Sequence, residues 1–212
     1  MNILLAGKYF FGDRPLNQNI INFFNKKKIK ILITEDKYNI DFLRKNEINF
    51  IINSGYGPII KEEIINIYHN KIINMHNSYL PNGRGIYPNL WSIFCNYQSG
   101  ITLCYLDKGI DTGDIILQKK VNFEDDNITL KESWTRLQVE LSKTLIDNWS
   151  NIINPTNILK QISKKNEISY HNRKYSEALL KKFSKKWDTT HYEVKKIARM
   201  FNFSYEKFIS QL

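Results

Sequence analysis

The sequence is poor in cysteine, glycine and proline, and each shortage excludes a class of protein. Its 212 residues include two cysteines, nine glycines and five prolines. Cys95 and Cys104 are too few for a disulfide framework or a thiolate metal cage, so the expected compartment is a reducing cytoplasm. The low glycine and proline counts exclude collagen-like and low-complexity chains.

Long hydrophobic runs are also missing. The apolar run that ends at Ala6 is soon followed by Lys8 and Asp13, and it is too short for a secretory signal. No stretch approaches the roughly 20 apolar residues of a membrane-crossing helix. The chain nevertheless contains 42% hydrophobic and 13% aromatic residues, enough apolar surface to offset the entropy of ordering. We therefore expect a folded, cytoplasmic protein with no membrane partner.

Acidic residues are too few to balance the basic ones. Lys and Arg number 31 and Asp and Glu number 21, which gives a formal net charge of +10. Lysine pairs in the last third of the chain, near Phe183 and Trp187, favour a nucleic-acid-binding module as one interpretation. Acidic residues interleave with these lysines, and no nucleic-acid-binding motif is present. We therefore expect no nucleic-acid partner, and the excess charge needs another explanation.

The first half of the chain alternates short apolar runs with amphipathic stretches. Strands are predicted over residues 2–6, 29–34, 49–54 and 71–75, and helices over 16–27, 38–46 and 59–68. This alternation implies right-handed βαβ crossovers and an α/β fold, with a Rossmann-like, mostly parallel sheet flanked by helices. Ligands of such sheets bind beyond the carboxyl ends of the strands.

The second half has a different pattern. It predicts a helix over 88–97, a hairpin of strands 101–106 and 115–123, and a long helix over 129–154 that ends before Pro155. We expect residues 1–154 to form the main domain. Residues 155–212 would form a short extension, partly helical around 176–183 and 192–201 and otherwise irregular. It would pack on the main domain or on a second copy of the chain.

Two clusters of polar residues follow predicted strands. Asn74 and His76 share one face at the end of a strand that a parallel sheet would normally make apolar. Asp107, Asp111 and Asp114 lie in the glycine-containing loop between the hairpin strands. Such residues often cap turns, and that interpretation stays open for each cluster alone. Together, an amide, an imidazole and a carboxylate on strand-end loops provide a polarising donor, a base and its orienting partner.

These two clusters resemble the formyltransferase family that uses N10-formyltetrahydrofolate. The matching motifs are Asn74-x-His76-x-Ser78-x-Leu80-Pro81, then Arg84-Gly85, then Asp107-x-Gly109-Ile110-Asp111-Thr112-Gly113-Asp114. Residues 54–60 are similar to the family's loop beside the folate. Residues 82–92, with Tyr170-His171 and Trp187-Asp188-Thr189, are most similar to the sugar N-formyltransferases.

The resemblance implies a role for each matching residue. His76 would be the base, Asn74 the donor to the oxyanion, and Asp111 the partner that orients His76. The formyl donor would be N10-formyltetrahydrofolate, with no metal. The residues expected to bind the folate are Tyr56, Gly57, Asp107, Gly109, Ile110 and Asp114. Those expected to bind the formyl acceptor are Lys8, Ser78, Tyr79, Asn82, Arg84, Tyr87 and Asn89.

The implied reaction moves a formyl group to the amine of a nucleotide-linked amino-deoxysugar used for surface polysaccharides or other glycans. Other family activities stay open: glycinamide ribonucleotide transformylase, formyltetrahydrofolate hydrolase and methionyl-tRNA formyltransferase. Residues 83–92 argue against the first two, and the helical pattern after residue 154 argues against the barrel domain of the third. Folate and nucleotide-sugar are both anionic, so the +10 charge would steer them to the protein. The resemblance implies that residues 1–154 are the catalytic domain, and it leaves a homodimer open.

Overall fold

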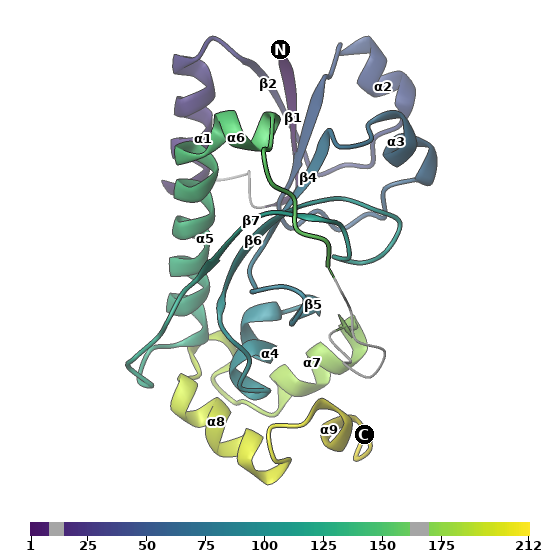
Figure 1. Cartoon of the computed structure of the whole chain (residues 1–212). Helices are drawn as coiled ribbons and strands as arrows, with labels where there is room; N and C mark the ends of the chain where they lie inside the picture. Colours follow the sequence, from purple (N-terminus) through teal and green to yellow (C-terminus); the bar gives the residue numbers. More distant parts are fainter. Residues whose placement is uncertain (9–14, 162–169) are drawn as a thin grey trace. The chain divides into compact units, whose positions relative to one another are not determined.

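The chain forms two compact units, each assembled from three segments. A computed structural model describes residues 1–8, 15–161 and 170–212 (Figure 1). Unit 1 comprises Met1–His76, Leu103–Leu117 and Val139–Lys160, and unit 2 comprises Asn77–Thr102, Gln118–Gln138 and Gln161–Leu212. This division differs from the predicted one at residue 154, because two internal segments belong to the same unit as the C-terminal extension.

A six-stranded sheet has the order β2-β1-β3-β4-β6-β7. Its strands are β1 Asn2–Ala6, β2 Lys30–Thr34, β3 Phe50–Asn53, β4 Ile72–His76, β6 Gly100–Tyr105 and β7 Ile115–Lys120. The first four strands of this order are mutually parallel. Leu106 N–H donates to the Ile72 carbonyl, and Cys104 Sγ lies 4.0 Å from the Asn74 carbonyl. Strand β6 is therefore antiparallel to β4. The predicted α/β class with a mostly parallel sheet is confirmed.

Helices cover both faces of the sheet in unit 1 (Figure 1). Leu43 of α2 (Ile40–Lys45) and Ile64 of α3 (Glu62–Ile67) share a buried cluster with Leu4 and Ile51 of the sheet. On the other face, Trp149 packs edge-on against the rings of Phe24 and Phe50 at 4.9 and 5.7 Å. Phe24 lies in α1 (Pro15–Lys26) and Trp149 in α6 (Trp149–Ile153). These apolar contacts fix the strands whose ends carry the polar clusters.

The predicted helix over 129–154 is two helices, α5 (Leu130–Asp147) and α6, so the prediction of one helix was wrong. The beginning of α5 is a capping box: Thr129 N–H donates to Glu132 Oε2, and Glu132 N–H donates to Thr129 Oγ1. The break lies at Asn148, whose side-chain amide donates to the Thr144 carbonyl. Asparagine interrupts helices in this way because its amide competes for backbone groups.

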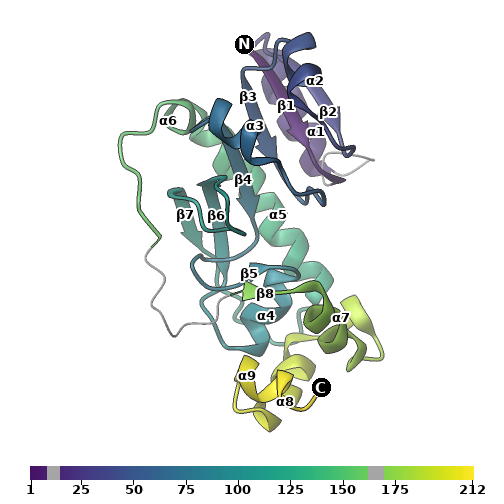
Figure 2. The same cartoon turned by 90° about the vertical axis from the view of Figure 1, so that its right-hand side faces the viewer.

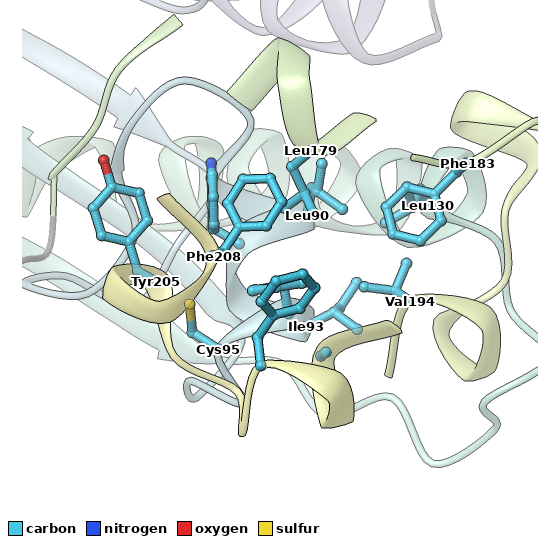
Figure 3. Packing of buried hydrophobic residues seen from close by; sticks show 13 residues of the cluster. Leu90, Ile93, Cys95, Leu130, Leu179, Phe183, Val194, Tyr205 and Phe208 are labelled. Atoms are coloured by element: carbon cyan, nitrogen blue, oxygen red, sulfur yellow. The ribbon is translucent and has the colours of Figure 1, made fainter. Parts of the chain in front are cut away.

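Unit 2 contains most of the C-terminal helices (Figure 2). Its elements include α4 (Pro88–Phe94), α7 (Arg173–Lys181), α8 (His191–Met200) and α9 (Tyr205–Ile209), with a 3-10 turn over Lys186–Asp188. One buried cluster contains apolar residues of α4, of the first position of α5, and of the C-terminal helices α7, α8 and α9. Figure 3 labels Leu90, Ile93, Cys95, Leu130, Leu179, Phe183, Val194, Tyr205 and Phe208 of this cluster. The extension therefore packs on residues that the sequence analysis assigned to the catalytic domain.

Two short strands hold the extension to the segment after β4. β5 (Arg84–Gly85) pairs in parallel with β8 (Tyr170–His171). The His171 ring stacks on Trp91 with centroids 4.3 Å apart, and the Trp91 indole N–H donates to Ser176 Oγ at 2.8 Å. Among the described residues, no helix is both long enough and apolar enough to span a bilayer.

Burial of His171 makes unit 2 sensitive to acid. The side chain is fully buried, neither ring nitrogen has a hydrogen-bond partner within the described part of the chain, and burial lowers its pKa to about 3. The unfolded histidine has a pKa of about 6.5. Between these values the unfolded state binds the additional proton, so the free energy of unfolding falls as the pH falls, by up to about 1.4 kcal/mol per pH unit.

Replacing His171 with Phe, which keeps a stacking ring, is expected to flatten this dependence. Urea unfolding at pH 7 and pH 5 should show a smaller loss of stability for His171→Phe than for the wild type. Burial also lowers the pKa of His191, to about 4. The stability of His171→Phe should therefore keep a smaller dependence on pH. The exposed His69 gives the matched control, His69→Phe. Equal losses in the wild type and His171→Phe would contradict the assignment.

Candidate active site

Asn74, His76 and Asp111 lie together at the end of β4. Asn74 and His76 are two residues apart on this strand and share a face, as predicted. The Asn74 side-chain amide donates to Asp111 Oδ1 at 2.8 Å, and Asp111 Oδ2 lies 3.7 Å from His76 Nδ1. His76 is 7% exposed. The carboxylate therefore faces the amide with one oxygen and the imidazole with the other.

The loop that carries Asp111 is closed by its own residues. Asp107 Oδ1 accepts hydrogen bonds from Gly109 N–H at 3.1 Å and from Thr112 Oγ1 at 2.6 Å. At the base of the loop, Tyr105 N–H donates to the Asp114 carbonyl at 2.9 Å. Asp111 itself has a φ of 53°, which non-glycine residues rarely adopt. The Asp107 side chain thus bonds within the loop, and its backbone is the part that can face a ligand.

The predicted folate-binding residues Tyr56 and Gly57 follow β3. The Tyr56 hydroxyl donates to the Asp36 carbonyl at 3.1 Å, and its ring lies 5.3 Å from that of Tyr38. Burial raises the pKa of Tyr56. A Cβ at Gly57 would meet open space, so close packing does not require glycine there. Tyr56 is thus held toward the α2 side of the sheet.

Ile110 and Lys108 lie on the outer part of the Asp111 loop. Ile110 is 51% exposed, an unusual exposure for a large apolar side chain beside a polar cluster. Lys108 forms an ion pair with Glu62 at the start of α3, and this contact lowers the pKa of Glu62. The loop is therefore tied to α3 while its apolar tip is open to solvent.

In unit 2, Ser78, Tyr79 and Asn82 follow β4. The Ser78 hydroxyl donates to the Asn82 carbonyl at 2.8 Å, and the Ser78 side chain is buried. Lys120 Nζ lies 5.8 Å from the centre of the Tyr79 ring. The Ser78 hydroxyl therefore shapes this turn, while Tyr79 and Asn82 are partly exposed.

Arg84 and Tyr87 also lie in unit 2. Arg84 is 7% exposed, and its Nη2 donates to Gln161 Oε1 at 2.8 Å. Tyr87 has a φ of 56° at the start of α4, and its ring packs edge-on against Trp187 at 4.9 Å. A guanidinium such as that of Arg84 is suited to holding an anion.

Asn89 lies inside the core of unit 2, whereas Lys8 is exposed. The Asn89 amide donates to the Leu130 carbonyl at 3.1 Å and to Ser133 Oγ at 2.9 Å, and the side chain is 2% exposed. These bonds use both amide protons of Asn89, so the side chain supports the packing of unit 2. This argues against the predicted contact between Asn89 and the formyl acceptor. Lys8 follows β1 at the carboxyl edge of the sheet.

Sequence reasoning missed Asn53 at the end of β3 and named the next residue, Ser54, only as part of the loop 54–60. Asn53 is the register partner of Asn74, and no partner for either Asn53 amide atom or for the Ser54 hydroxyl occurs among the described residues. A Cβ at Gly7 would lie 2.2 Å from the Ser54 carbonyl oxygen, so the ends of β1 and β3 approach closely. A single polar residue ending the apolar strand Phe50–Asn53 was the available signal.

The central triad can move a proton and stabilise negative charge. A neutral imidazole can take a proton from a nucleophile, an adjacent carboxylate stabilises the imidazolium, and an amide can donate to an oxyanion. In residues 1–8, 15–161 and 170–212 there is no group of three or more His, Cys, Asp or Glu side chains arranged to hold a metal ion. The amide, imidazole and carboxylate of the triad are suited to acyl transfer.

The family model described as "Formyl transferase" matches residues 11–148. The chain belongs to the formyl transferase family. The matched range contains Asn74, His76 and the whole loop of Asp111. The resemblance predicted from these motifs is therefore confirmed.

Two kinds of relative resemble this chain. The methionyl-tRNA formyltransferase of Clostridium tetani is 31% identical over 183 residues, which cover 84% of this chain and 57% of that protein. That of Caldanaerobacter subterraneus is 39% identical over 128 residues, which cover 57% of this chain and 41% of that protein. The chain thus spans about half the length of these curated relatives.

Solved structures give a second comparison. The formyltransferase PseJ of Anoxybacillus kamchatkensis, solved with UDP-4,6-dideoxy-4-formamido-L-AltNAc and tetrahydrofolate, has a TM-score of 0.78 and 31% identity. The match covers 92% of this chain and 97% of that one. The N-formyltransferase of Helicobacter canadensis has a TM-score of 0.61 and 22% identity, with 81% and 71% covered. At that identity the second likeness concerns the fold alone.

Proposed function

We propose that the protein transfers the formyl group of N10-formyltetrahydrofolate to the amine of a nucleotide-linked amino sugar. The observation that carries this proposal is the likeness to PseJ, which extends over 97% of that chain at 31% identity. The methionyl-tRNA formyltransferases match at similar identity but over 57% or 41% of their length. The extent of the match therefore favours the sugar acceptor.

The reaction begins with attack of the acceptor's amine nitrogen on the formyl carbon. The new C–N bond creates a tetrahedral intermediate whose oxygen carries negative charge. Neutral His76 accepts the proton that the amine loses, a contribution typically of about 10²–10⁴ in rate. The bond between the formyl carbon and N10 then breaks, and the same proton is delivered to N10. Atoms and charge balance without a further reactant.

Asn74 and Asp111 support this proton transfer. One proton of the Asn74 amide is donated to Asp111 Oδ1, which leaves the second for the oxyanion. Such a donor is typically worth about 10²–10³ in rate. Asp111 Oδ2, 3.7 Å from His76 Nδ1, stabilises the imidazolium as it forms. Each member of the triad thus has a separate task.

The remaining site residues are proposed to bind the two substrates. In unit 1, Tyr56, Gly57 and Ile110, with the backbone of Asp107, Gly109 and Asp114, would bind the folate, and Lys8 would contact the acceptor. In unit 2, Tyr79, Asn82, Arg84 and Tyr87 would contact the acceptor, with Ser78 and Asn89 shaping their surroundings. The net charge of +10 would steer both anionic substrates toward the protein. We place the reaction in the cytoplasm.

Separate assays with different acceptors test the proposal. Purified protein and N10-formyltetrahydrofolate are incubated with nucleotide-linked 4-amino and 3-amino deoxysugars, methionyl-tRNA, glycinamide ribonucleotide or no acceptor. We expect release of tetrahydrofolate only with an amino sugar. Release with methionyl-tRNA alone would replace the proposed acceptor with the one named by the sequence relatives. Release without any acceptor would indicate a hydrolase.

A further inference from the structure

The loop of Asp111 contains a hydrogen-bonded clamp in which the triad does not take part. We call the Asp107 carboxylate, the Gly109 N–H and the Thr112 hydroxyl the Asp107–Thr112 clamp. Its two bonds, of 3.1 and 2.6 Å, both end on Asp107 Oδ1. Thr112 directly follows Asp111 in the chain, so the clamp closes the loop around Asp111.

Glycine at 109 is required by this arrangement. A Cβ at Gly109 would lie 2.0 Å from Thr112 Oγ1 and 3.1 Å from Thr112 Cβ. The Gly109 Cα therefore lies close beneath the threonine hydroxyl, and any larger residue would displace the hydroxyl from Asp107. The loop's Asp, Gly and Thr thus form one interdependent set.

The backbone of Asp111 needs such support. Its φ of 53° places a non-glycine residue in the left-handed region, which persists only where the surroundings determine it. In this conformation one carboxylate oxygen accepts from Asn74 and the other faces His76. If Thr112 were released, the backbone at Asp111 would be free to relax and the carboxylate to turn away.

We propose that Thr112 and Asp107 are positioning residues, which act on the reaction through Asp111. By fixing the chain on both sides of Asp111, the clamp keeps the carboxylate facing His76 and Asn74. The inference rests on the proposed function for its kinetic readout, but its NMR readout requires no substrate. Lys108 is unsuitable for testing the clamp by substitution, because its ion pair with Glu62 connects the outside of the loop to α3.

Thr112→Val and Thr112→Ser separate the hydroxyl from the shape of the side chain. Valine keeps the branched shape and removes the donor, whereas serine keeps the donor. Gly109→Ala is a second disrupting variant, which leaves Thr112 in place but pushes its hydroxyl away. Thr135→Val is the matched control, because Thr135 lies exposed on α5 and bonds within its own helix.

Two readouts are measured on each folded variant. The first is the NMR signal of the Asn74 side-chain amide, which donates to Asp111 Oδ1; it is recorded without substrate, and Asn74→Ala identifies the signal. The second is kcat and KM for each substrate. Thr112→Val and Gly109→Ala should move the signal of the Asn74 amide, because the carboxylate that accepts its proton turns away. Both should also lower kcat about ten-fold or more. Thr112→Val should do so with KM nearly unchanged, whereas Gly109→Ala also alters the backbone proposed to bind the folate and can raise the KM for the folate. Thr112→Ser and Thr135→Val should resemble the wild type.

The outcomes distinguish the two proposals. If Thr112→Val and Gly109→Ala leave the signal of the Asn74 amide as it is in the wild type, or if Thr112→Ser behaves like Thr112→Val, the clamp does not position Asp111. If the wild type formylates no acceptor but the variants still move the signal of the Asn74 amide in the expected order, the clamp stands and the proposed function fails. If Thr112→Val alone fails to fold, Gly109→Ala and Thr112→Ser give the same decision.

Discussion

Replacing His76 with Asn is expected to lower kcat for formyl transfer by about 10²–10⁴-fold while the protein stays folded. The imidazole is the triad's base, and asparagine cannot accept the amine's proton. Asparagine is smaller and polar, so it fits beside Asp111 without an uncompensated charge. His76 lies at the end of β4 and is not a member of either described apolar cluster, the one around Leu4 and Ile51 or the one around Trp91.

Steady-state kinetics with saturating folate and acceptor measure this effect. His69→Asn is the matched control, because it is the same substitution at an exposed residue that follows α3, away from the triad. Its kcat should equal that of the wild type. A His76→Asn variant with more than about a tenth of wild-type kcat would contradict the assignment of His76 as the base.

Replacing Asn74 with Ala is expected to lower kcat by about 10²–10³-fold with little change in KM. The amide is needed when the formyl oxygen becomes negatively charged, so its loss raises the barrier more than it weakens substrate binding. The substitution also removes the 2.8 Å hydrogen bond to Asp111 Oδ1, so Asp111 becomes less well fixed toward His76.

The ratio of effects on kcat and KM decides this prediction. Asn25→Ala on the exposed face of α1 is the control, with the same side chain removed outside the triad. A rise in KM at unchanged kcat would show that Asn74 binds the ground state of a substrate. The oxyanion role would then be wrong.

The site triad could be predicted from the sequence because each residue lies at a position with a clear pattern. Asn74 and His76 interrupt an apolar strand with a two-residue period, and Asp111 lies in a loop flanked by glycines that joins two alternating strands. The parallel strands that precede them in the chain could be predicted because each is a short apolar run. Strand order brings the β4 end and the β6–β7 loop together, and the sequence contained both signals.

Other features depend on contacts between distant segments and leave little local pattern. The pairing of β5 with β8 involves two residues on each side, and its register depends on segments 86 residues apart, as between Arg84 and Tyr170. The burial of Asn89 requires the Leu130 carbonyl and Ser133 as partners. The break at Asn148 was hidden because apolar residues continue the helical stripe on both sides of it.

The central claim is most directly tested by following the formyl carbon. The protein is incubated with N10-formyltetrahydrofolate labelled with carbon-13 in the formyl group and with a nucleotide-linked 4-amino-4,6-dideoxysugar, and the products are analysed by NMR. We expect the label in a formamide on the sugar nitrogen, with about a hundredth of it or less when His76→Asn replaces the wild type over the same interval. Label found only in free formate, or in formyl-methionyl-tRNA when both acceptors compete, would contradict the account.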